Sequence, residues 1–330
     1  MSWLVLGLAR SGQAAALALR RRGEEVIGVD ASPNIDVGRL AETGVEVHLG
    51  TEEERLLDGV ETLVKSPGVP GNAPLVQAAR TRGIPVWSEV ELGSRLLATT
   101  IVAVTGTNGK TTTSELLGAM LRAPVAGNVG RALTELDGSV RPGEVVVCEV
   151  SSFQLEDIHE FKPHVAVLLN LEPDHLDRHG TFEAYADAKL RIFENQEADD
   201  VAVVPRRFEA TPGQAQRIEF APTDELPAEP VIPGAHNREN AAAATAVARA
   251  LGLDDARIGE AAREMDVALE LAGVDHELSG DLETAVRSAA KKARPGEIVL
   301  LAPACASYDQ FHDFEERGEA FKRLVAEVAG

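Results

Sequence analysis

The feature that most constrains the fold of this chain is a regular alternation of two kinds of segment. Short apolar runs rich in branched residues, such as 3–6 and 25–30, are each followed by a turn and by a stretch rich in alanine and leucine. Branched residues favour strands, whereas alanine and leucine favour helices. Strands that alternate with helices form parallel sheets covered by helices on both faces, so the sequence predicts an α/β fold.

The alternation starts again at 99–106 and continues through two further apolar runs, 144–152 and 164–175. The last part of the chain is predicted to contain a helix, a strand with its loop and a closing helix, at 280–296, 297–307 and 314–330. We therefore predict three domains, with the bounds 1–95, 96–262 and 263–330.

The composition limits the partners of the chain. The formal net charge is −21 at pH 7, and a field of this sign repels nucleic acids and anionic membranes, so we expect neither as a partner. A nucleotide would need local positive potential from helix N-termini, a few basic side chains or bound metal. Cys148 and Cys305 lie in apolar runs and are expected to be reduced, buried thiols. No leader and no membrane-spanning run is present, so we expect a soluble, cytoplasmic protein.

The segment TGTNGKTTT, residues 105–113, lies between a predicted strand and a predicted helix. A P-loop requires a glycine where Val104 stands, so the strict pattern is not met. Gly106 and Gly109 still allow backbone N–H groups to face an anion, because no Cβ obstructs them. The alternative is an ordinary connection between a strand and a helix.

The residues after these glycines indicate a nucleotide phosphate as the anion. A helix expected from about Ser114 adds the positive end of its dipole. Lys110 can reach the outer phosphates, and Thr111 can offer its hydroxyl to Mg²⁺.

Two later strand ends carry groups that can bind a metal. Glu149 ends an apolar run, where a carboxylate is costly unless it is paired or bound to a cation. This position suits a nucleotide's Mg²⁺, and the alternative is a carboxylate that faces water. Asp174, His175, Asp177 and His179 crowd the next loop. Histidine is an uncommon Mg²⁺ ligand, so on its own this loop is better interpreted as solvated.

Residues 181–196 are predicted to be helical, with one stripe formed by Phe182, Tyr185, Lys189, Ile192 and Phe193. Lys189 is the only charged member of this stripe. Its stem could be buried while its amine reaches water at the rim. The alternative is a functional lysine, because partial desolvation lowers the pKa and leaves a nucleophilic neutral amine.

Near the end of the second alternating region, His236, Asn237 and Asn240 stand at a predicted helix start. Capping of the helix by Asn237 is the simple explanation for these polar residues.

The turn GLARSG, residues 7–12, raises a different possibility. It approximates a dinucleotide-binding fingerprint, with Asp30 at the end of the following strand. Ala9 replaces the middle glycine, which weakens a close approach of the backbone to a pyrophosphate. Binding of NAD is thus an alternative.

Taken together, these segments resemble the Mur ligase superfamily, and in particular its members that add D-glutamate. The motifs occur in the family's order and span nearly the whole chain: TGTNGKTTT, GNVG at 127–130, EVSSFQLE, NLEPDHLDRHG, AKLRIFEN, GAHNRENAAAA and APACASYDQFHDFEERGEAF. The first motif is shared across the superfamily, whereas SSFQLE and the last motif resemble the D-glutamate-adding members.

The resemblance implies an α/β, three-domain Mur ligase architecture: a Rossmann-like N-terminal domain that binds UDP, a P-loop central ATPase domain and a Rossmann-like C-terminal domain. It also implies ATP-dependent addition of D-glutamate to UDP-N-acetylmuramoyl-L-alanine in peptidoglycan synthesis. The substrate carboxylate attacks the γ-phosphate, and the amine of D-glutamate then attacks the resulting acyl phosphate. A cytoplasmic monomer is implied.

The resemblance also assigns roles to residues. For ATP it implies Gly106, Thr107, Asn108, Gly109, Lys110, Thr111 and Thr112, with Asn237 and Asn240 on the adenine side. Two Mg²⁺ ions would involve Thr111, Glu149, His175 and Lys189, the last carbamylated, and the catalytic residues would be Lys110, His175 and Lys189. For the UDP-sugar and D-glutamate it implies Gly7, Arg10, Ser11, Ser66, Gly68, Asn128, Ser151, Gln154, Ser307, Phe311 and Phe314.

The sequence departs from the family in its C-terminal domain, which is incomplete. An HR pair, an NDSKATN-type segment and a glycine-rich strand end are missing there, and 121–130 and 217–237 are contracted. The missing segment normally supplies an arginine, an aspartate and a lysine around the nucleotide and D-glutamate. Three interpretations stay open: segments left out of the sequence, a deletion, or an inactive or truncated paralogue that only binds UDP-N-acetylmuramoyl-L-alanine or nucleotide.

Overall fold

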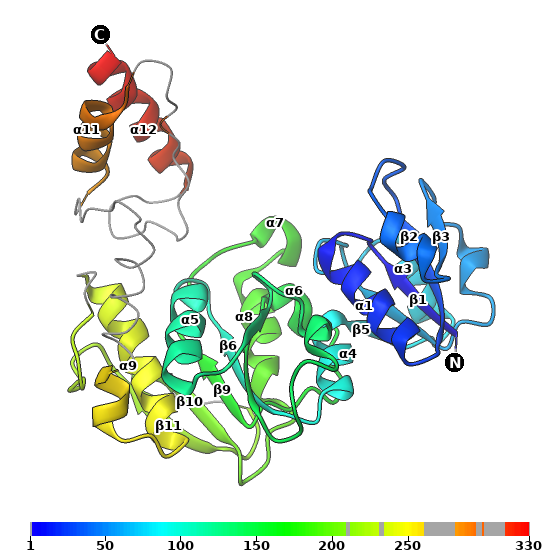
Figure 1. Ribbon diagram of the computed structural model, residues 1–330, viewed down its shortest axis with the longest axis horizontal. Coiled ribbons are helices and arrows are strands. Elements are labelled where there is room, and N and C mark those ends of the chain that lie inside the picture. Colours follow the sequence, from blue (N-terminus) through cyan, green and yellow to red (C-terminus); the bar gives the residue numbers. More distant parts are fainter. Residues whose placement is uncertain are drawn as a thin grey trace.

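The computed structural model of the chain describes residues 2–208, 212–230, 234–260, 281–294, 299 and 314–329. This part contains two parallel sheets, one in each of two successive units (Figure 1). We call residues 2–96 the first unit and residues 100–250 the second unit. The α/β prediction is confirmed. None of the described helices could serve as a membrane span.

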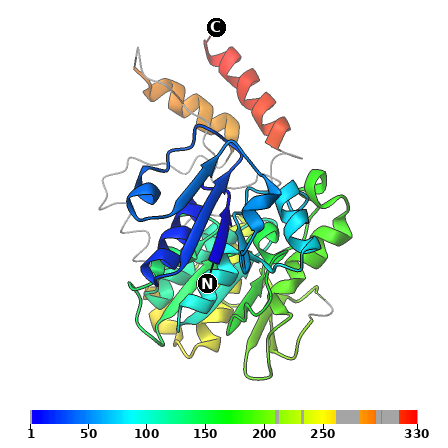
Figure 2. The ribbon, with the colours of Figure 1, turned by 90° about the vertical axis from the view of Figure 1, so that its right-hand side faces the viewer.

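The first unit has five parallel strands in the order β3-β2-β1-β4-β5. Its elements are β1 (Ser2–Leu6), α1 (Arg10–Arg21), β2 (Glu25–Asp30), α2 (Gly38–Glu42), β3 (Glu46–Leu49), η1 (Glu54–Leu57), β4 (Thr62–Lys65), α3 (Pro74–Thr81), β5 (Val86–Ser88) and α4 (Glu89–Leu96). Figure 2 brings these strands, drawn in blue, to the front.

Each face of this sheet has its own apolar core, because side chains alternate along a strand. Leu4 and Leu6 of β1 point to the core under α3, whereas Trp3 and Val5 point to the core under α1. The alanines of α1 let this helix lie close to the sheet.

The second unit has six parallel strands in the order β11-β10-β9-β6-β8-β7. Its elements are β6 (Thr100–Thr105), α5 (Lys110–Leu121), β7 (Val125–Gly127), η2 (Leu133–Leu136), β8 (Val145–Glu149), α6 (Ser152–Leu155), β9 (Val165–Leu168), α7 (Leu176–His179), α8 (Phe182–Leu190), η3 (Arg191–Phe193), β10 (Val201–Pro205), β11 (Gln216–Phe220) and α9 (Ala235–Ala250).

The same alternation builds two cores in the second unit. Val102 and Val104 of β6 pack with α5 and α9 on one face, whereas Ile101 and Ala103 pack with η2, α6 and η3 on the other. Strand β6 lies beside β9, and the connection after β6 leads to β7 on one side whereas the connection after β9 leads to β10 on the other. Ligands of parallel α/β sheets bind at the carboxyl end of such a switch point, which is where the predicted phosphate-binding turn lies.

Buried contacts join the two units. Helix α4 packs against η2, where Gly93 lies against Leu133 so closely that an added Cβ would be 2.7 Å from Leu133 Cγ. The carboxylate of Glu91 is fully buried and accepts hydrogen bonds from the backbone N–H groups of residues 159–161. The first unit is thereby fixed to the loop between α6 and β9.

The described part of residues 263–330 consists mainly of α11 (Leu282–Lys292) and α12 (Phe314–Ala329). These helices pack together, with an ion pair of 3.5 Å between Arg287 and Glu327. The strand predicted at 297–307 lies outside the described residues except for Val299. The domain boundaries near 95 and 262 stay predictions.

Candidate active site

The turn after β6 places a helix directly against the predicted phosphate position. Gly106 and Gly109 have φ angles of +155° and +81°, which favour glycine. Gly109 is the N-cap, so α5 begins at Lys110 and not near Ser114 as expected from the sequence. The left-handed conformation of Gly109 allows the residue that follows it to be helical. As a result, Lys110 and Thr111 belong to the first turn, whose N–H groups have no partner within the helix.

Neighbouring loops hold this turn from the carboxyl end of β9. Asn170 brackets Asn108: its Oδ1 accepts from the Asn108 N–H at 2.8 Å, and its Nδ2 donates to the Asn108 carbonyl at 3.1 Å. The hydroxyl of Thr107 lies 2.9 Å from that of Tyr185 and accepts from the Glu172 N–H at 3.0 Å. The Asn108 N–H is therefore engaged within the protein, and the N–H groups that begin α5 remain for an anion.

The sequence did not single out Asn170 or a polar role for Tyr185. Asn170 is a polar residue just after an apolar strand, which is a usable signal. The hydroxyl of Tyr185 could not have been assigned, because its contact with Thr107 spans 78 positions of sequence.

Two lysines converge on one backbone carbonyl in the turn. Lys110 Nζ donates to the carbonyls of Gly106 and Thr107 at 2.9 and 2.8 Å. Lys189 Nζ, from α8, donates to the same Gly106 carbonyl at 2.8 Å. The charge of Lys110 supplies local positive potential that a polyphosphate needs in a chain of strongly negative net charge.

Lys189 is only 2 % exposed, so the prediction of an amine at the rim is wrong. Burial, together with the nearby charge of Lys110, lowers the pKa of Lys189 to about 7, while Asp174 and Glu149 oppose this shift. Burial also lowers the pKa of Lys110. The helix predicted over 181–196 ends at Leu190 and continues as a short 3₁₀ turn, η3.

The lowered pKa predicts a pH-dependent stability. Unfolded lysine titrates near 10.5 and folded Lys189 near 7, so between these values the unfolded chain binds the extra proton. The free energy of unfolding should therefore rise with pH in this window, by at most about 1.4 kcal/mol per pH unit from this group. Below pH 7 both states are protonated and the contribution is constant.

Urea unfolding at pH 6 to 9, in buffer free of metal and CO₂, checks this pH dependence. The Lys189→Met chain should have a flatter curve than the wild type above pH 7. Parallel curves for the two chains would contradict a buried amine with a lowered pKa.

Glu149 lies at the end of β8 and is 2 % exposed, so the alternative of a carboxylate facing water is wrong. Its Oε1 accepts from Asn128 Nδ2 at 2.9 Å, and its backbone carbonyl accepts from the Asn128 N–H at 2.8 Å. Asn128, predicted to contact substrate, is thus placed where it orients the carboxylate.

His175 is the residue before α7 and has a φ of +51°, a conformation that costs energy for a residue with a side chain. Its side chain is 49 % exposed and lies 3.6 Å from Asp174 Oδ2. Backbone strain of this kind is concentrated at functional sites. Within the part of the chain that the structure describes, no three His, Cys, Asp or Glu side chains form a metal-binding group.

Ser151 and Gln154 bond to each other in a capping box at the start of α6. Gln154 Oε1 accepts from the N–H and the hydroxyl of Ser151 at 3.0 and 2.9 Å. Gln154 Nε2 is buried and has no partner among the described residues. A buried donor without an acceptor is costly, so a ligand oxygen would stabilise this arrangement.

Asn240 lies in the second turn of α9 and is buried against the phosphate-binding turn. A Cβ on Gly109 would be 2.2 Å from Asn240 Oδ1. The N-cap of α9 is Gly234, so capping by Asn237 is wrong; Asn237 lies within the helix. Asn240 thus lies against the turn, and His236 is exposed.

In the first unit, the predicted sugar-nucleotide residues gather at the carboxyl ends of β1 and β4. Ser66 Oγ donates to the Gly7 carbonyl at 2.6 Å, and Gly7 has a φ of +85°. Arg10 and Ser11 begin α1, and Gly68 is exposed in the loop after β4.

The carboxylate of Asp30 argues against NAD. Its two oxygens accept from the N–H groups of Leu8 and Ser32 at 2.6 and 2.8 Å, so both are engaged by the protein. A dinucleotide fold uses this carboxylate for a ribose hydroxyl.

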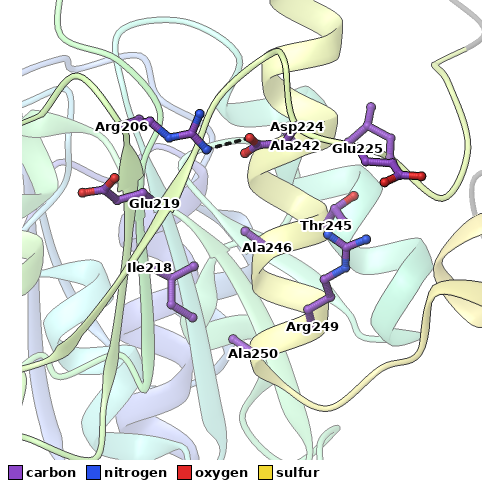
Figure 3. Close-up of a pocket in the computed structure, with 11 residues that line it drawn as sticks. Arg206, Ile218, Glu219, Asp224, Glu225, Ala242, Thr245, Ala246, Arg249 and Ala250 are labelled. Atoms are coloured by element: carbon purple, nitrogen blue, oxygen red, sulfur yellow. Dashed lines mark hydrogen bonds and ion pairs between the residues drawn. The ribbon is translucent and has the colours of Figure 1, made fainter.

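A separate pocket of about 360 Å³ lies between β11 and α9 (Figure 3). Its charged groups are largely paired, with Arg206 on Asp224 at 2.7 Å and Arg249 on Asp255 at 2.8 Å. None of the predicted site residues lines it.

The structure leaves the predicted D-glutamate residues undescribed. Ser307 and Phe311 lie outside the described residues. Phe314 is the first residue of α12, and for Phe314 only the backbone is described. Of the two cysteines, Cys148 is a buried free thiol, as expected, and Cys305 lies outside the described part.

Comparison with known families identifies the class to which this fold and site belong. Residues 104–221 match the Mur ligase middle domain, and residues 1–88 match the Mur ligase MurD-like N-terminal domain. The chain belongs to the Mur ligase family.

Curated relatives in this family carry the name UDP-N-acetylmuramoylalanine--D-glutamate ligase. The protein from Anaeromyxobacter dehalogenans is 35 % identical, with 98 % of this chain and 97 % of the relative covered. The protein from Acidobacterium capsulatum is 33 % identical, with 98 % and 95 % covered. The first alignment extends over 450 positions, which exceeds the 330 residues of this chain, so the relatives have segments inside the matched range that this chain lacks.

Solved structures support the fold. The UDP-N-acetylmuramate:L-alanyl-gamma-D-glutamyl-meso-diaminopimelate ligase from Neisseria meningitides is 20 % identical, with a TM-score of 0.55, and the match covers 79 % of this chain and 96 % of that one. The murein peptide ligase from Psychrobacter arcticus is 18 % identical, with a TM-score of 0.52, over 79 % and 68 % of the two chains. At this identity the likeness concerns the fold.

Proposed function

We propose that this protein is an ATP-dependent ligase that adds D-glutamate to UDP-N-acetylmuramoyl-L-alanine during peptidoglycan precursor synthesis in the cytoplasm. The observation that carries this proposal is the convergence of Lys110 and Lys189 on the Gly106 carbonyl, beside buried Glu149. Such a site holds the terminal phosphates of a nucleotide. The curated relatives supply the identity of the two other substrates.

The chain's own groups account for the phosphate chemistry. The N–H groups that begin α5 hold the phosphates, and Lys110 neutralises the charge that develops on the γ-phosphoryl group. A carboxylate oxygen of the sugar nucleotide attacks the γ-phosphorus, the bond to the bridging oxygen breaks, and ADP leaves. The amine of D-glutamate then attacks the acyl carbon and loses a proton, and the bond to phosphate breaks to give the amide.

Residues at the turn suit Mg²⁺ in the chemistry of their donors. The hydroxyl of Thr111 and the carboxylate of Glu149 are oxygen ligands, and His175 would help to hold a second ion. Bound Mg²⁺ would offset negative charge on the transferred phosphoryl group. The amine of Lys189 does not suit Mg²⁺, but its carbamate would provide oxygen ligands, and a pKa of about 7 makes the neutral amine available for carbamylation.

The remaining residues would bind the organic parts of the substrates in a monomer that has no nucleic acid or membrane as a partner. Asn237 and Asn240 would contact the adenine side of ATP. The UDP-sugar would contact Gly7, Arg10, Ser11, Ser66 and Gly68 in the first unit, and Asn128, Ser151 and Gln154 in the second. D-glutamate would contact Ser307, Phe311 and Phe314.

The second candidate function is binding without catalysis, because the alignment shows segments that this chain lacks. Phosphate release from MgATP, measured with each substrate omitted in turn, separates the two. The proposed ligase should release phosphate only when UDP-N-acetylmuramoyl-L-alanine and D-glutamate are both present. Binding of the sugar nucleotide without phosphate release would support the inactive chain.

Loss of Lys110 is expected to abolish most of this activity. The Lys110→Met chain should lose about a thousandfold in kcat, because one charged donor to the γ-phosphoryl group is removed. Lys162→Met is the matched control, since Lys162 is exposed and pairs with Glu197 at 2.8 Å. Equal phosphate release by both variants would contradict the role of Lys110.

A further inference from the structure

We propose that Arg178 is a positioning residue that couples the sugar-nucleotide site of the first unit to the catalytic loop of the second. Arg178 belongs to α7, and its guanidinium donates to the carbonyls of Pro67 and Val69, both at 3.0 Å. These carbonyls belong to the loop after β4, in the first unit. The guanidinium also lies 3.7 Å from the centre of the Phe153 ring, which holds it in place from the second unit.

The loop that Arg178 contacts is part of the proposed UDP site. Ser66 begins this loop, is 4 % exposed and donates to the Gly7 carbonyl at 2.6 Å. The loop and the glycine turn of β1 therefore move together. Occupancy by the UDP group, which would contact Gly7, Ser66 and Gly68, would fix the carbonyls of Pro67 and Val69.

A cluster of charges anchors the two ends of the same loop on the second unit. Lys65 Nζ lies 3.0 Å from Asp157 Oδ2, and its side chain is fully buried. Arg80 Nη2 lies 2.8 Å from Asp157 Oδ1, while Arg80 Nη1 donates to the Gly71 carbonyl at 2.9 Å. Both ends are thus held by Asp157, which follows α6. Two side chains of α7 reach this network: His179 lies 3.3 Å from Glu156, which is 3.8 Å from Lys65, whereas Arg178 bonds directly to the backbone of the loop.

Helix α7 depends on such contacts for its place. It has one turn, and none of its four residues is fully buried. His175, the proposed metal ligand, immediately precedes it in a strained conformation, and the Arg178 N–H donates to the His175 carbonyl at 3.1 Å. A shift of the loop after β4 would therefore be transmitted through Arg178 to the backbone of His175.

The coupling rests on the proposed function and predicts that the two substrates bind cooperatively. In the wild type, saturating UDP-N-acetylmuramoyl-L-alanine should tighten binding of Mg²⁺ and AMP-PNP by about fivefold or more. In the Arg178→Met chain, the ratio of the nucleotide's affinities with and without the sugar nucleotide should fall to within about twofold of one, because the link is lost. Each ligand alone should bind within about threefold of its wild-type affinity, since Arg178 bonds to protein carbonyls and is not among the residues proposed to contact either ligand.

Calorimetric titration of each ligand, with and without the other, tests this proposal. Arg22→Met is the matched control: Arg22, at the far end of α1, also joins the two units through Asp137 at 2.8 Å, and it donates to the Leu96 carbonyl of its own unit at 2.9 Å. This variant should keep the wild-type ratio. Arg178→Lys, which keeps the charge, should give an intermediate ratio and serves if the methionine variant does not fold.

The outcomes separate this inference from the proposed function. A wild-type chain that releases phosphate but has no coupling, or Arg178 variants that keep the wild-type coupling, would overturn the inference alone. A wild-type chain that neither binds the sugar nucleotide nor releases phosphate would overturn the proposed function and the inference with it. Loss of coupling in the Arg22→Met chain as well would assign the effect to the interface in general and overturn a specific role for Arg178.

Discussion

The Gly109→Ala chain is expected to bind MgATP at least about a hundredfold more weakly than the wild type. Gly109 has a φ of +81°, and a Cβ there would lie 2.2 Å from Asn240 Oδ1 and 2.9 Å from Asn240 Cγ. Atoms cannot approach so closely, so the Asn240 side chain must rotate away from the turn or α9 and the start of α5 must move apart. Both carry groups proposed to hold the nucleotide, and a displacement of about 1 Å is enough for a loss of this size.

Gly138→Ala is the matched control for this change. Gly138 has the same φ of +81°, but an added Cβ would meet nothing within 4 Å. It therefore carries the same backbone strain, about 1–2 kcal/mol, without the contact. Calorimetric titration with AMP-PNP and Mg²⁺ should show wild-type affinity for Gly138→Ala. Similar affinities for the two variants would mean that the contact with Asn240 does not position the turn.

The Glu91→Ala chain is expected to be less stable by about 3–5 kcal/mol, because a buried, fully bonded charge is removed from its partners. The Glu91 carboxylate accepts from the N–H groups of His159, Glu160 and Phe161 at 2.9, 3.1 and 2.9 Å. It also accepts from Arg95 Nε at 2.6 Å. Alanine would leave these donors without an acceptor where water has little access.

Glu160→Ala provides the comparison, because Glu160 pairs with the same Arg95 at 3.0 Å but is 74 % exposed. An exposed pair of this kind contributes little, so the stability should change little. Urea unfolding gives the stability, and hydrogen exchange at the amides of 159–161 locates the effect. If both variants lose equal stability, burial of the Glu91 carboxylate is not what secures the junction of the two units.

Local sequence patterns were sufficient to predict the helices and strands and part of the candidate site. Alternating apolar runs predicted the parallel sheets, and Gly106 and Gly109 predicted the turn, because both signals depend on a few neighbouring residues. Lys189 stood out as the one charge in an apolar stripe. Its partner, the Gly106 carbonyl, could not be foreseen, since it lies 83 positions away in the sequence.

The predictions that failed concern helix ends and long-range contacts. The start of α5 was placed too late because the left-handed Gly109 begins the helix at Lys110. Capping by Asn237 failed because the chain enters α9 at Gly234. Asn170, Glu91 and Arg178 act on backbone groups of other segments, and a single sequence contains no signal that pairs them.

The bond between Lys189 and Gly106 also bears on the order in which the chain acquires its structure. It closes a segment that contains β7, β8 and β9, whose parallel pairing forms slowly because distant residues must meet. The first unit is complete by Leu96, whereas the turn after β6 gains its second lysine only after synthesis has passed α8. The second lysine therefore reaches the turn only once β6 to β9 have paired, and a nascent chain that ends before α8 lacks this part of the site.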